Sequence, residues 1–329
     1  MSSEFSIIDQ FFKPLSAGMK QQGEIGIGDD GAVISCPSES QLVVVTDTLI
    51  EGVHFPEQTD AYDIAWKALA VNLSDLAAMG ATPAFYTLAL TLPEKYHDDP
   101  WLMAFADGLK AIGERFNIPL VGGDTTKGPV LTLTITAQGW VPVGEAILRA
   151  GAGVGDDIYV SGLIGDGGLG LKAVEQMLEE TGQDYRQCIE KLNRPMPRIE
   201  LGKALLSLAS AAIDISDGLL ADLKHILEAS AVSADVDFSQ VPFSSAMMRY
   251  QRRSRDYLMP LVAGDDYELC FTASKARRAE IEALAETIGV RLSRIGEIKE
   301  LEGQASRVCL MNLPENLADL EGRQGYQHF

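Results

Sequence analysis

Short acidic turns recur along the chain, and their carboxylates are the residues with the most evident chemistry. The first turn reads Glu24-Ile-Gly-Ile-Gly-Asp29-Asp30-Gly31, with two adjacent carboxylates between glycines. Two like charges in contact are unfavourable unless a cation lies between them, and glycines let the backbone approach a ligand closely. A single Asp-Gly turn is more often a hairpin connector. The repetition of the pattern is therefore what predicts a cation site.

Five acidic elements lie at the ends of apolar segments: Asp29 with Asp30, Asp47, Asp75, Asp124, and Asp214 with Asp217. Residues at the same ends of neighbouring strands converge in α/β folds, so we expect these carboxylates to share one pocket. Oxygen ligands without His or Cys are typical of hard cations, above all Mg²⁺. Each aspartate also has an ordinary interpretation as a turn, solvated or capping residue, and the hypothesis depends on their recurrence together.

A carboxylate cluster of this kind predicts phosphoryl transfer, because Mg²⁺ is usually shared between protein carboxylates and substrate phosphates. The chain has no G-x-x-x-x-G-K-[ST] motif and no H-R-D motif, which excludes a P-loop enzyme and argues against a protein kinase. The segment Gly165–Gly170 fits G-x-G-x-x-G, but Asp166 lies where a pyrophosphate would approach. An NAD site is therefore the weaker alternative, and the amide groups there could instead face a nucleotide phosphate.

The elements that must position these residues alternate between strands and helices, which predicts an α/β or α+β class. We expect strands at 41–48, 84–92, 130–141, 158–161 and 292–298, with the acidic turns 212–218 and 262–268 bordering strands. We expect helices at 5–13, 61–79, 100–116 and 275–288, one from the Gly-rich turn to about residue 180, and one ending near residue 210. A polar, Gly-rich stretch around Arg149 predicts two domains, 1–148 and 149–329.

Composition limits the classes of partner. Among 329 residues, 27 Lys and Arg face 47 Asp and Glu, a formal net charge of -20, which argues against a nucleic-acid or anionic-membrane binder. No apolar run approaches the roughly 20 residues that span a bilayer, and the N-terminus lacks a signal-peptide pattern. The four cysteines (Cys36, Cys188, Cys270 and Cys309) form no C-x-x-C pair, so we expect reduced core residues in a cytoplasmic protein.

Seven segments together resemble the thiamine-monophosphate kinase family, within the superfamily typified by aminoimidazole ribonucleotide synthetase. In chain order they are Gly26–Gly31, Thr46–Thr48, His54–Phe55, Ala68–Gly80, Gly122–Thr126, Asp214–Gly218 and Asp265–Leu269. The resemblance spans nearly the whole chain. The run Val-Asn-Leu-Ser-Asp-Leu-Ala-Ala-Met-Gly is the segment most specific to the superfamily, and the Asp-Ile-Ser-Asp-Gly and Asp-Tyr-Glu-Leu segments narrow it further.

The resemblance implies the reaction of ATP with thiamine phosphate to give ADP and thiamine diphosphate, the last step of thiamine diphosphate biosynthesis. It implies an N-terminal domain (1–148) that binds ATP and Mg²⁺ and whose sheet pairs with that of a second subunit in a homodimer, and a C-terminal α/β domain (149–329). The metal ligands that it implies are Asp30, Thr46, Asp47, Asp75, Asp124, Asp214 and Asp217. Contacts to ATP would come from Gly123, Asp124, Arg149 and Ser216. Asp124, Arg149 and Asp217 would be catalytic.

The resemblance also implies contacts to thiamine phosphate from His54, Asp265 and the C-terminal residues Arg323 and Tyr326. Two of these depart from the family pattern. Many relatives have Glu where this chain has Asp265, which shortens the contact. Relatives often place a tryptophan at the position of Arg323, which leaves Tyr326 as the alternative stacking residue.

Several other functions stay open at this point. Selenophosphate synthetase calls for a reactive cysteine before the N-terminal Gly-rich loop, and the hydrogenase maturation relative for a C-terminal cysteine; this chain has neither. Aminoimidazole ribonucleotide synthetase shares the acidic sites and is separated only by motif details. From other classes, an acidic cation-binding protein without turnover and an NAD-dependent oxidoreductase remain as alternatives.

Overall fold

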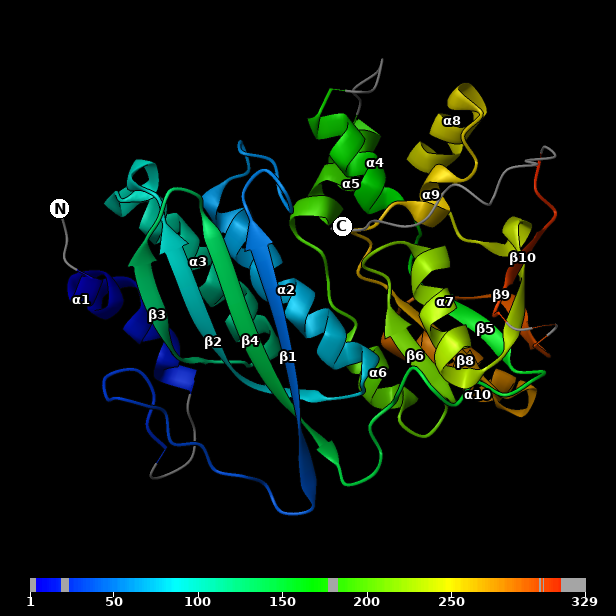
Figure 1. The fold of residues 1–329 in the computed structure, drawn as a ribbon, viewed down its shortest axis with the longest axis horizontal. Coiled ribbons are helices and arrows are strands. Elements are labelled where there is room, and N and C mark those ends of the chain that lie inside the picture. The colour runs from blue at the N-terminus through cyan, green and yellow to red at the C-terminus, as the bar shows by residue number, and fades with distance from the viewer. Residues whose placement is uncertain (1–3, 19–23, 177–182, 302, 304, 315–329) are drawn as a thin grey trace. The chain divides into compact units, whose positions relative to one another are not determined.

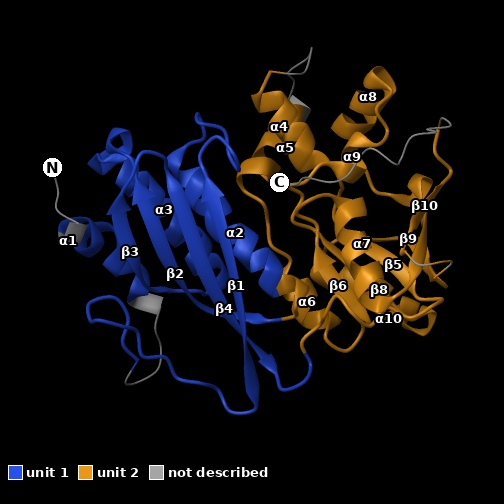
Figure 2. Ribbon diagram, viewed as in Figure 1, with its two compact units in different colours: residues 1–76, 81–145 blue, residues 77–80, 146–329 orange. Residues whose placement is uncertain are grey.

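The structure is a computed structural model that describes residues 4–18, 24–176, 183–301, 303 and 305–314 (Figure 1). The chain divides into two compact units, which Figure 2 shows in different colours. Unit 1 comprises residues 1–76 and 81–145, and unit 2 comprises residues 77–80 and 146–329. The C-terminal residues Arg323 and Tyr326 lie outside the described part of the chain.

Unit 1 is built on a four-stranded sheet in the order β1-β4-β2-β3. Its strands are β1 (Ser40–Ile50), β2 (Thr82–Leu92), β3 (Leu120–Lys127) and β4 (Thr132–Pro142). Only the β2–β3 pair is parallel, and the helix α3 (Asp99–Phe116) makes the crossover that parallel neighbours require. Along β4, buried residues alternate with half-buried ones, so one face of the sheet is covered and the other is open.

Two long helices lie behind the sheet, α3 and α2 (Ala61–Ala78) (Figure 1). The start of α3 is capped by Asp98, which accepts a hydrogen bond of 2.9 Å from the Trp101 N–H. The two helices approach closely at Gly108, where any Cβ would overlap the carbonyl oxygen of Tyr62. Gly80, with φ +72°, supplies the left-handed residue after α2. At the N-terminus, α1 (Glu4–Ile7) is followed by two short helical turns to residue 18.

Unit 2 contains a six-stranded sheet in the order β10-β7-β9-β5-β8-β6. The strands are β5 (Asp157–Ser161), β6 (Ala211–Asp214), β7 (Ser233–Asp237), β8 (Leu269–Ala273), β9 (Leu292–Lys299) and β10 (Val308–Met311). The helices are α4 (Asp166–Val174), α5 (Gln183–Asn193), α6 (Ile199–Leu205), α7 (Leu219–Ser230), α8 (Ser245–Ser254), α9 (Met259–Val262) and α10 (Arg278–Ile288). Strands β5 and β8 are buried along their whole length and pair in the core.

The predicted elements are confirmed for most of the chain, and the mixed class is confirmed in both units. The structure corrects the predictions in several places. The helix expected to reach residue 180 ends at Val174, and a separate helix, α5, follows; strands β7 and β10 and helix α8 were not predicted. The Gly122–Thr126 segment lies inside a strand, β3, that was not predicted. Cys188 and Cys270 are buried as expected, whereas Cys36 and Cys309 are exposed.

No helix in the described residues is long and apolar enough to cross a bilayer.

Candidate active site

A row of hydroxyl groups covers the open face of the unit 1 sheet. Thr46 donates a hydrogen bond of 2.9 Å to Thr136, and Thr48 and Thr134 share another of 2.9 Å. The strand pairings place Asp124 in the same row as Thr134 and Thr48. Because paired residues of neighbouring strands point to the same side, the Asp124 carboxylate lies on this hydroxyl-rich face and is exposed.

Asp47 points to the other side of the sheet. Its row runs through Ile135 and Leu88, both buried, to Gly123. Three strand spacings, roughly 14 Å, separate Asp47 from Gly123 at the other end of this row. Asp47 and Asp124 thus lie on opposite faces of the sheet, because a shift of one residue along a strand reverses the face. That they share one pocket stays a prediction.

The helix-covered side of the sheet, to which Asp47 points, also contains the candidate ligands of α2. Asp75 is half-buried on this helix, and Asn72 is fully buried one turn before it. The Asn72 amide donates to the Ala68 carbonyl at 3.0 Å, but its Oδ1 atom has no hydrogen-bond partner among the described residues. Buried polar atoms without a partner are rare and commonly mark a bound ion or water. The donor set of oxygen atoms here fits a hard cation.

The loop that contains Asp29 and Asp30 is closed by two backbone hydrogen bonds between Ile25 and Val33, of 3.0 and 2.8 Å. Within the loop, the Asp29 carboxylate accepts from the Asp30 N–H at 2.9 Å. Both aspartates are exposed. The structure thus places Asp30 on a short solvent-facing turn.

His54 lies in the turn that follows β1. The Nδ1 atom of its ring accepts a hydrogen bond of 3.0 Å from the Ile50 N–H, and the backbone N–H of His54 donates to the Ile50 carbonyl at 3.0 Å. A neutral imidazole that accepts at Nδ1 carries its proton on Nε2. The turn therefore fixes the orientation and tautomer that a substrate contact by His54 would use.

In unit 2, the turn after β6 brings together Asp214, Ser216 and Asp217, and it adds a fourth residue that was not predicted. Asp222, in the first turn of α7, accepts hydrogen bonds from the backbone N–H groups of Ser216, Asp217 and Gly218 at 3.0, 3.0 and 3.1 Å. Burial, together with the charges of Asp214 and Asp217, raises the pKa of the Asp222 carboxyl to about 8. Asp214 and Asp217 thus place negative charge next to the buried Asp222 carboxyl group.

The second acidic turn, residues 264–268, packs directly against the first. The Asp265 N–H donates to the Ser216 carbonyl at 3.0 Å, and the Tyr267 N–H donates to the Ile215 carbonyl at 2.8 Å. Asp265 and Tyr267 have φ values of +68° and +49°, a conformation that is unfavourable for side chains and is concentrated at functional sites. The Tyr267 hydroxyl donates to Asp265 at 3.2 Å, which orients the carboxylate predicted to contact substrate.

The Gly-rich start of α4 does not offer its amide groups to a ligand. The Gly165 and Gly167 N–H groups donate to the two carboxylate oxygens of Asp266 at 2.6 and 3.1 Å. Burial raises the pKa of Asp266 well above its usual value, against the effect of these two bonds. The dinucleotide interpretation of this segment, and the alternative of a phosphate bound there, are therefore wrong, because the chain's own carboxylate fills the anion position.

Arg149 is held away from the acidic turns of unit 2. Its backbone carbonyl accepts from the Ser230 hydroxyl at 3.3 Å, at the last residue of α7. The Asp217 turn precedes the first residue of this helix, and a 12-residue helix is about 18 Å long. Arg149 is exposed, so within unit 2 the structure does not bring it together with Asp217.

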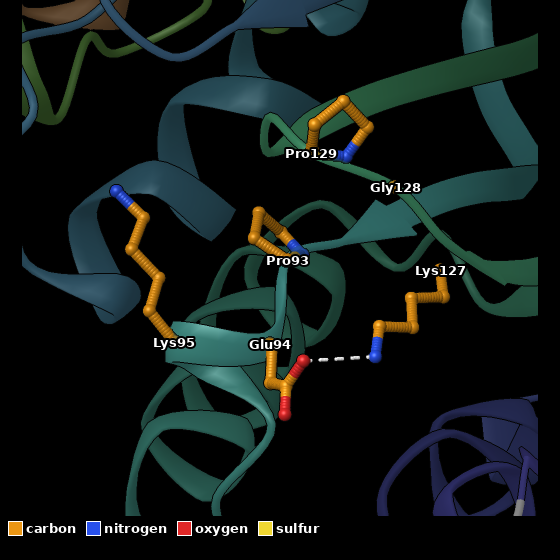
Figure 3. A pocket seen from close by; sticks show the side chains of 6 residues that line it. All are labelled: Pro93, Glu94, Lys95, Lys127, Gly128 and Pro129. Carbon is orange, nitrogen blue, oxygen red and sulfur yellow. Dashed lines mark hydrogen bonds and ion pairs between the residues drawn. The ribbon is translucent and has the colours of Figure 1, made fainter.

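A pocket of about 420 Å³ in unit 1 contains none of the predicted site residues. Figure 3 shows its lining by Pro93, Glu94, Lys95, Lys127, Gly128 and Pro129. Lys127 is paired with Glu94 at 2.9 Å, and Lys95 with Glu51 at 2.8 Å. Because both ammonium groups are neutralised by carboxylates, this pocket is a poor candidate for an anionic substrate.

No group of three or more His, Cys, Asp or Glu side chains in the described part of the chain is arranged to hold a metal ion. Mg²⁺ usually takes only one or two carboxylates and completes its coordination with water and substrate phosphates. The smaller carboxylate sets described above are compatible with that pattern.

Comparison with known proteins places the two units in one family. The models of AIR synthase related protein match residues 28–141 (N-terminal domain) and 153–308 (C-terminal domain). A thiamine-monophosphate kinase from Salmonella typhimurium is 44% identical over 99% of this chain and 98% of its own length. The chain belongs to the thiamine-monophosphate kinase family. The resemblance inferred from the motifs is thereby confirmed.

Solved structures of thiamine-monophosphate kinases have the same fold. The enzyme from Stenotrophomonas maltophilia K279a is 46% identical, with a TM-score of 0.84 over 93% of this chain and 96% of that chain. A second structure, described as "AaThiL complexed with AMPPCP and TMP", is 29% identical, with a TM-score of 0.76 over 99% of this chain and 97% of that chain. The expected two-domain architecture of this family is confirmed by these similarities.

Proposed function

We propose that this protein is a thiamine-monophosphate kinase, which transfers the terminal phosphoryl group of ATP to the phosphate of thiamine phosphate. The observation that carries the proposal is the 44% identity to a kinase of this name over essentially both full lengths. The fold similarity to a structure complexed with AMPPCP and TMP supports ATP and thiamine phosphate as the substrates. The products are ADP and thiamine diphosphate.

The reaction needs little acid–base catalysis from the protein. The acceptor oxygen belongs to a phosphate that is already ionised, so no general base has to remove a proton from it. The barrier lies instead in bringing two polyanions into line. The residues therefore have to position both phosphates and compensate their charge, and the site's carboxylates, hydroxyls and arginine are suited to these tasks.

Bound Mg²⁺ would supply the positive charge that bridges and neutralises the phosphate oxygens. We assign its ligands to Asp30, Thr46, Asp47, Asp75, Asp124, Asp214 and Asp217. The unpartnered Oδ1 atom of Asn72 beside Asp75, and the accumulated negative charge around Asp214 and Asp217, support this assignment. Because Asp47 and Asp124 point to opposite faces of the sheet, we assign them to different ions.

The remaining roles follow the same division. Gly123, Arg149 and Ser216 would contact ATP, and Arg149 would act on a phosphate from a position separate from the Asp217 turn. His54 and Asp265 would bind thiamine phosphate, with Arg323 and Tyr326 from the C-terminal segment. We assign residues 1–148 to ATP and Mg²⁺ binding and 149–329 to the second domain. We also propose that the protein functions in the cytoplasm.

We further propose that the protein is a homodimer in which the unit 1 sheets pair. Leu42 and Val44 of β1 are exposed and point away from buried Val43, so the open sheet face carries apolar residues beside its threonines. A second copy of the same face would cover them. Light scattering of the purified protein tests this: a mass near that of a single chain across micromolar concentrations would exclude the dimer.

The reaction is tested by incubating the protein with ATP, Mg²⁺ and thiamine phosphate and measuring thiamine diphosphate and ADP, which should appear in equal amounts. Asp75→Asn and Asp124→Asn should each lower turnover at least about 100-fold without loss of fold, because each removes a metal charge at constant volume. Asp107→Asn, at an exposed position of α3, is the control. Near-normal activity in both variants would exclude the proposed ligands.

A further inference from the structure

Three consecutive backbone N–H groups of the turn Ser216-Asp217-Gly218 point at a single oxygen atom, Oδ2 of Asp222. Asp222 lies in the first turn of α7 and is only 2% exposed. Gly218 has φ +113°, and a Cβ there would press on the Val262 backbone at 2.7 Å. The turn is thus tightly specified by one internal acceptor and one glycine.

Successive N–H groups that converge on one point are typical of anion-binding turns. Here the chain's own carboxylate takes the anion position, so the backbone of this turn is not free to bind a phosphate. What the turn can present to a ligand is its side chains. These are the Ser216 hydroxyl and the Asp217 carboxylate, which the proposed function assigns to ATP and Mg²⁺.

We propose that Asp222 is a positioning residue: by accepting these three N–H groups it fixes Ser216 and Asp217 in the orientation that binds the Mg²⁺–nucleotide complex. The inference rests on the proposed function for the identity of the ligands. The turn also has a second support, since Asp265 and Tyr267 donate to the carbonyls of Ser216 and Ile215. Loss of Asp222 should therefore loosen the ligand-bearing turn locally and leave β6 paired with β8.

Two variants separate hydrogen bonding from charge. Asp222→Asn and Asp222→Ala both remove the ionisable carboxyl group, but only the asparagine keeps an oxygen at the position where the N–H groups converge. If Asp222 acts by positioning, alanine should be much worse than asparagine. If it acts only through its charge, the two variants should lose function equally. Asp237→Ala removes another aspartate that accepts a backbone N–H in unit 2, from Ser239 at 3.0 Å, and serves as the matched control.

Three measurements are made on each full-length variant: Mn²⁺ affinity in the presence of ATP, from the free-Mn²⁺ electron paramagnetic resonance signal; kcat and KM for ATP; and the thermal midpoint. We expect Asp222→Ala to weaken Mn²⁺ binding by at least about tenfold, the size of effect found when a partner of a metal ligand is lost. Asp222→Asn should stay within about fivefold, and Asp237→Ala should match the wild type in Mn²⁺ affinity and kinetics.

The inference is overturned if Asp222→Ala binds Mn²⁺ within twofold of the wild type while its thermal midpoint falls, since the role would then be structural. Equal losses in both Asp222 variants would also overturn it. Should the alanine variant fail to fold, Asp222→Asn decides alone, and a loss of tenfold or more would contradict positioning. A wild type that binds Mn²⁺ but forms no thiamine diphosphate would refute the proposed function and leave the Mn²⁺ comparison interpretable.

Discussion

Glu268→Gln is expected to destabilise unit 2 strongly, because Glu268 is half of a buried ion pair. Its two carboxylate oxygens accept from the Arg198 guanidinium at 2.6 and 2.5 Å, and one of them also accepts from the Ser161 hydroxyl at 2.5 Å. The Glu268 and Arg198 side chains are 5% and 22% exposed. The neutral glutamine keeps the volume but leaves the guanidinium without a counter-charge in a poorly solvated position.

Removing one partner of a buried pair typically costs about 3–5 kcal/mol. The Arg198 side chain is about a fifth exposed, so water can solvate part of the uncompensated charge. We therefore expect a loss of stability at the lower end of this range, about 3 kcal/mol. For a unit of this size, about 1 kcal/mol corresponds to a shift of about 2–4 °C, so the thermal midpoint should fall by about 6–12 °C.

Differential scanning calorimetry and circular dichroism of the variant at neutral pH measure this shift. Lys203→Ala is the control, on the helix α6 that Arg198 precedes. It removes an exposed pair with Glu200 of 3.0 Å, which should be worth less than about 1 kcal/mol. Adding Arg198→Met to Glu268→Gln should recover part of the loss, because the unpaired charge is then gone. A Glu268→Gln midpoint within 2 °C of the wild type would refute the reasoning.

Two further substitutions test other parts of the structure. Burial raises the pKa of Asp157, but hydrogen bonds and charges from Arg278, with a smaller contribution from Arg294, outweigh it and hold the pKa below its usual range. The stability that Asp157→Asn removes should therefore be constant from pH 5 to 8 and shrink below about pH 4, as acid denaturation curves would show; a difference unchanged at pH 2 would contradict this. Gly123→Ala should lower the thermal midpoint and weaken ATP binding, because the added Cβ would overlap the Leu88 carbonyl. Gly122→Ala is the control: the nearest atom to its Cβ would be 3.8 Å away, so its thermal midpoint should match that of the wild type.

The elements that carry the strongest local signals were predictable from the sequence. Helix α2 begins after Asp60 and ends before Gly80, as its cap and stop residues indicate. The helix α5 was missed because it is mostly polar and, over residues 185–193, buries only Tyr185, Cys188 and Leu192. Such a pattern is difficult to separate from a loop when a Pro-marked segment follows it.

The acidic turns could be found from the sequence, but not which face each carboxylate occupies. The positions of Asp47 and Asp124 on opposite faces depend on the register between β1, β4, β2 and β3, and these strands pair across tens of residues. Asp266 likewise caps the start of α4 from about 100 residues away. For Asp222 a local signal did exist, since an aspartate four residues after Gly218 at a helix start can reach back to the preceding turn.

The charge of the chain predicts that nucleotide binding depends on a divalent cation. The chain has a formal net charge of -20. The described turns of unit 2 carry carboxylates, and backbone N–H groups of these turns already donate to Asp222 and Asp266. Free ATP, itself a polyanion, should be repelled at these turns unless cations lie between.

Millimolar ATP with EDTA should therefore leave the thermal midpoint unchanged, whereas ATP with Mg²⁺ should raise it by several degrees through linkage of binding to folding. Calcium chloride and sodium chloride at matched ionic strength control for cation type and for screening. Because Ca²⁺ prefers more ligands at longer distances than the compact Mg²⁺, it should restore less of the shift. If ATP with EDTA stabilised the protein as much as ATP with Mg²⁺, the nucleotide would bind through direct protein contacts, and the carboxylate turns would not be its cation-bridged site.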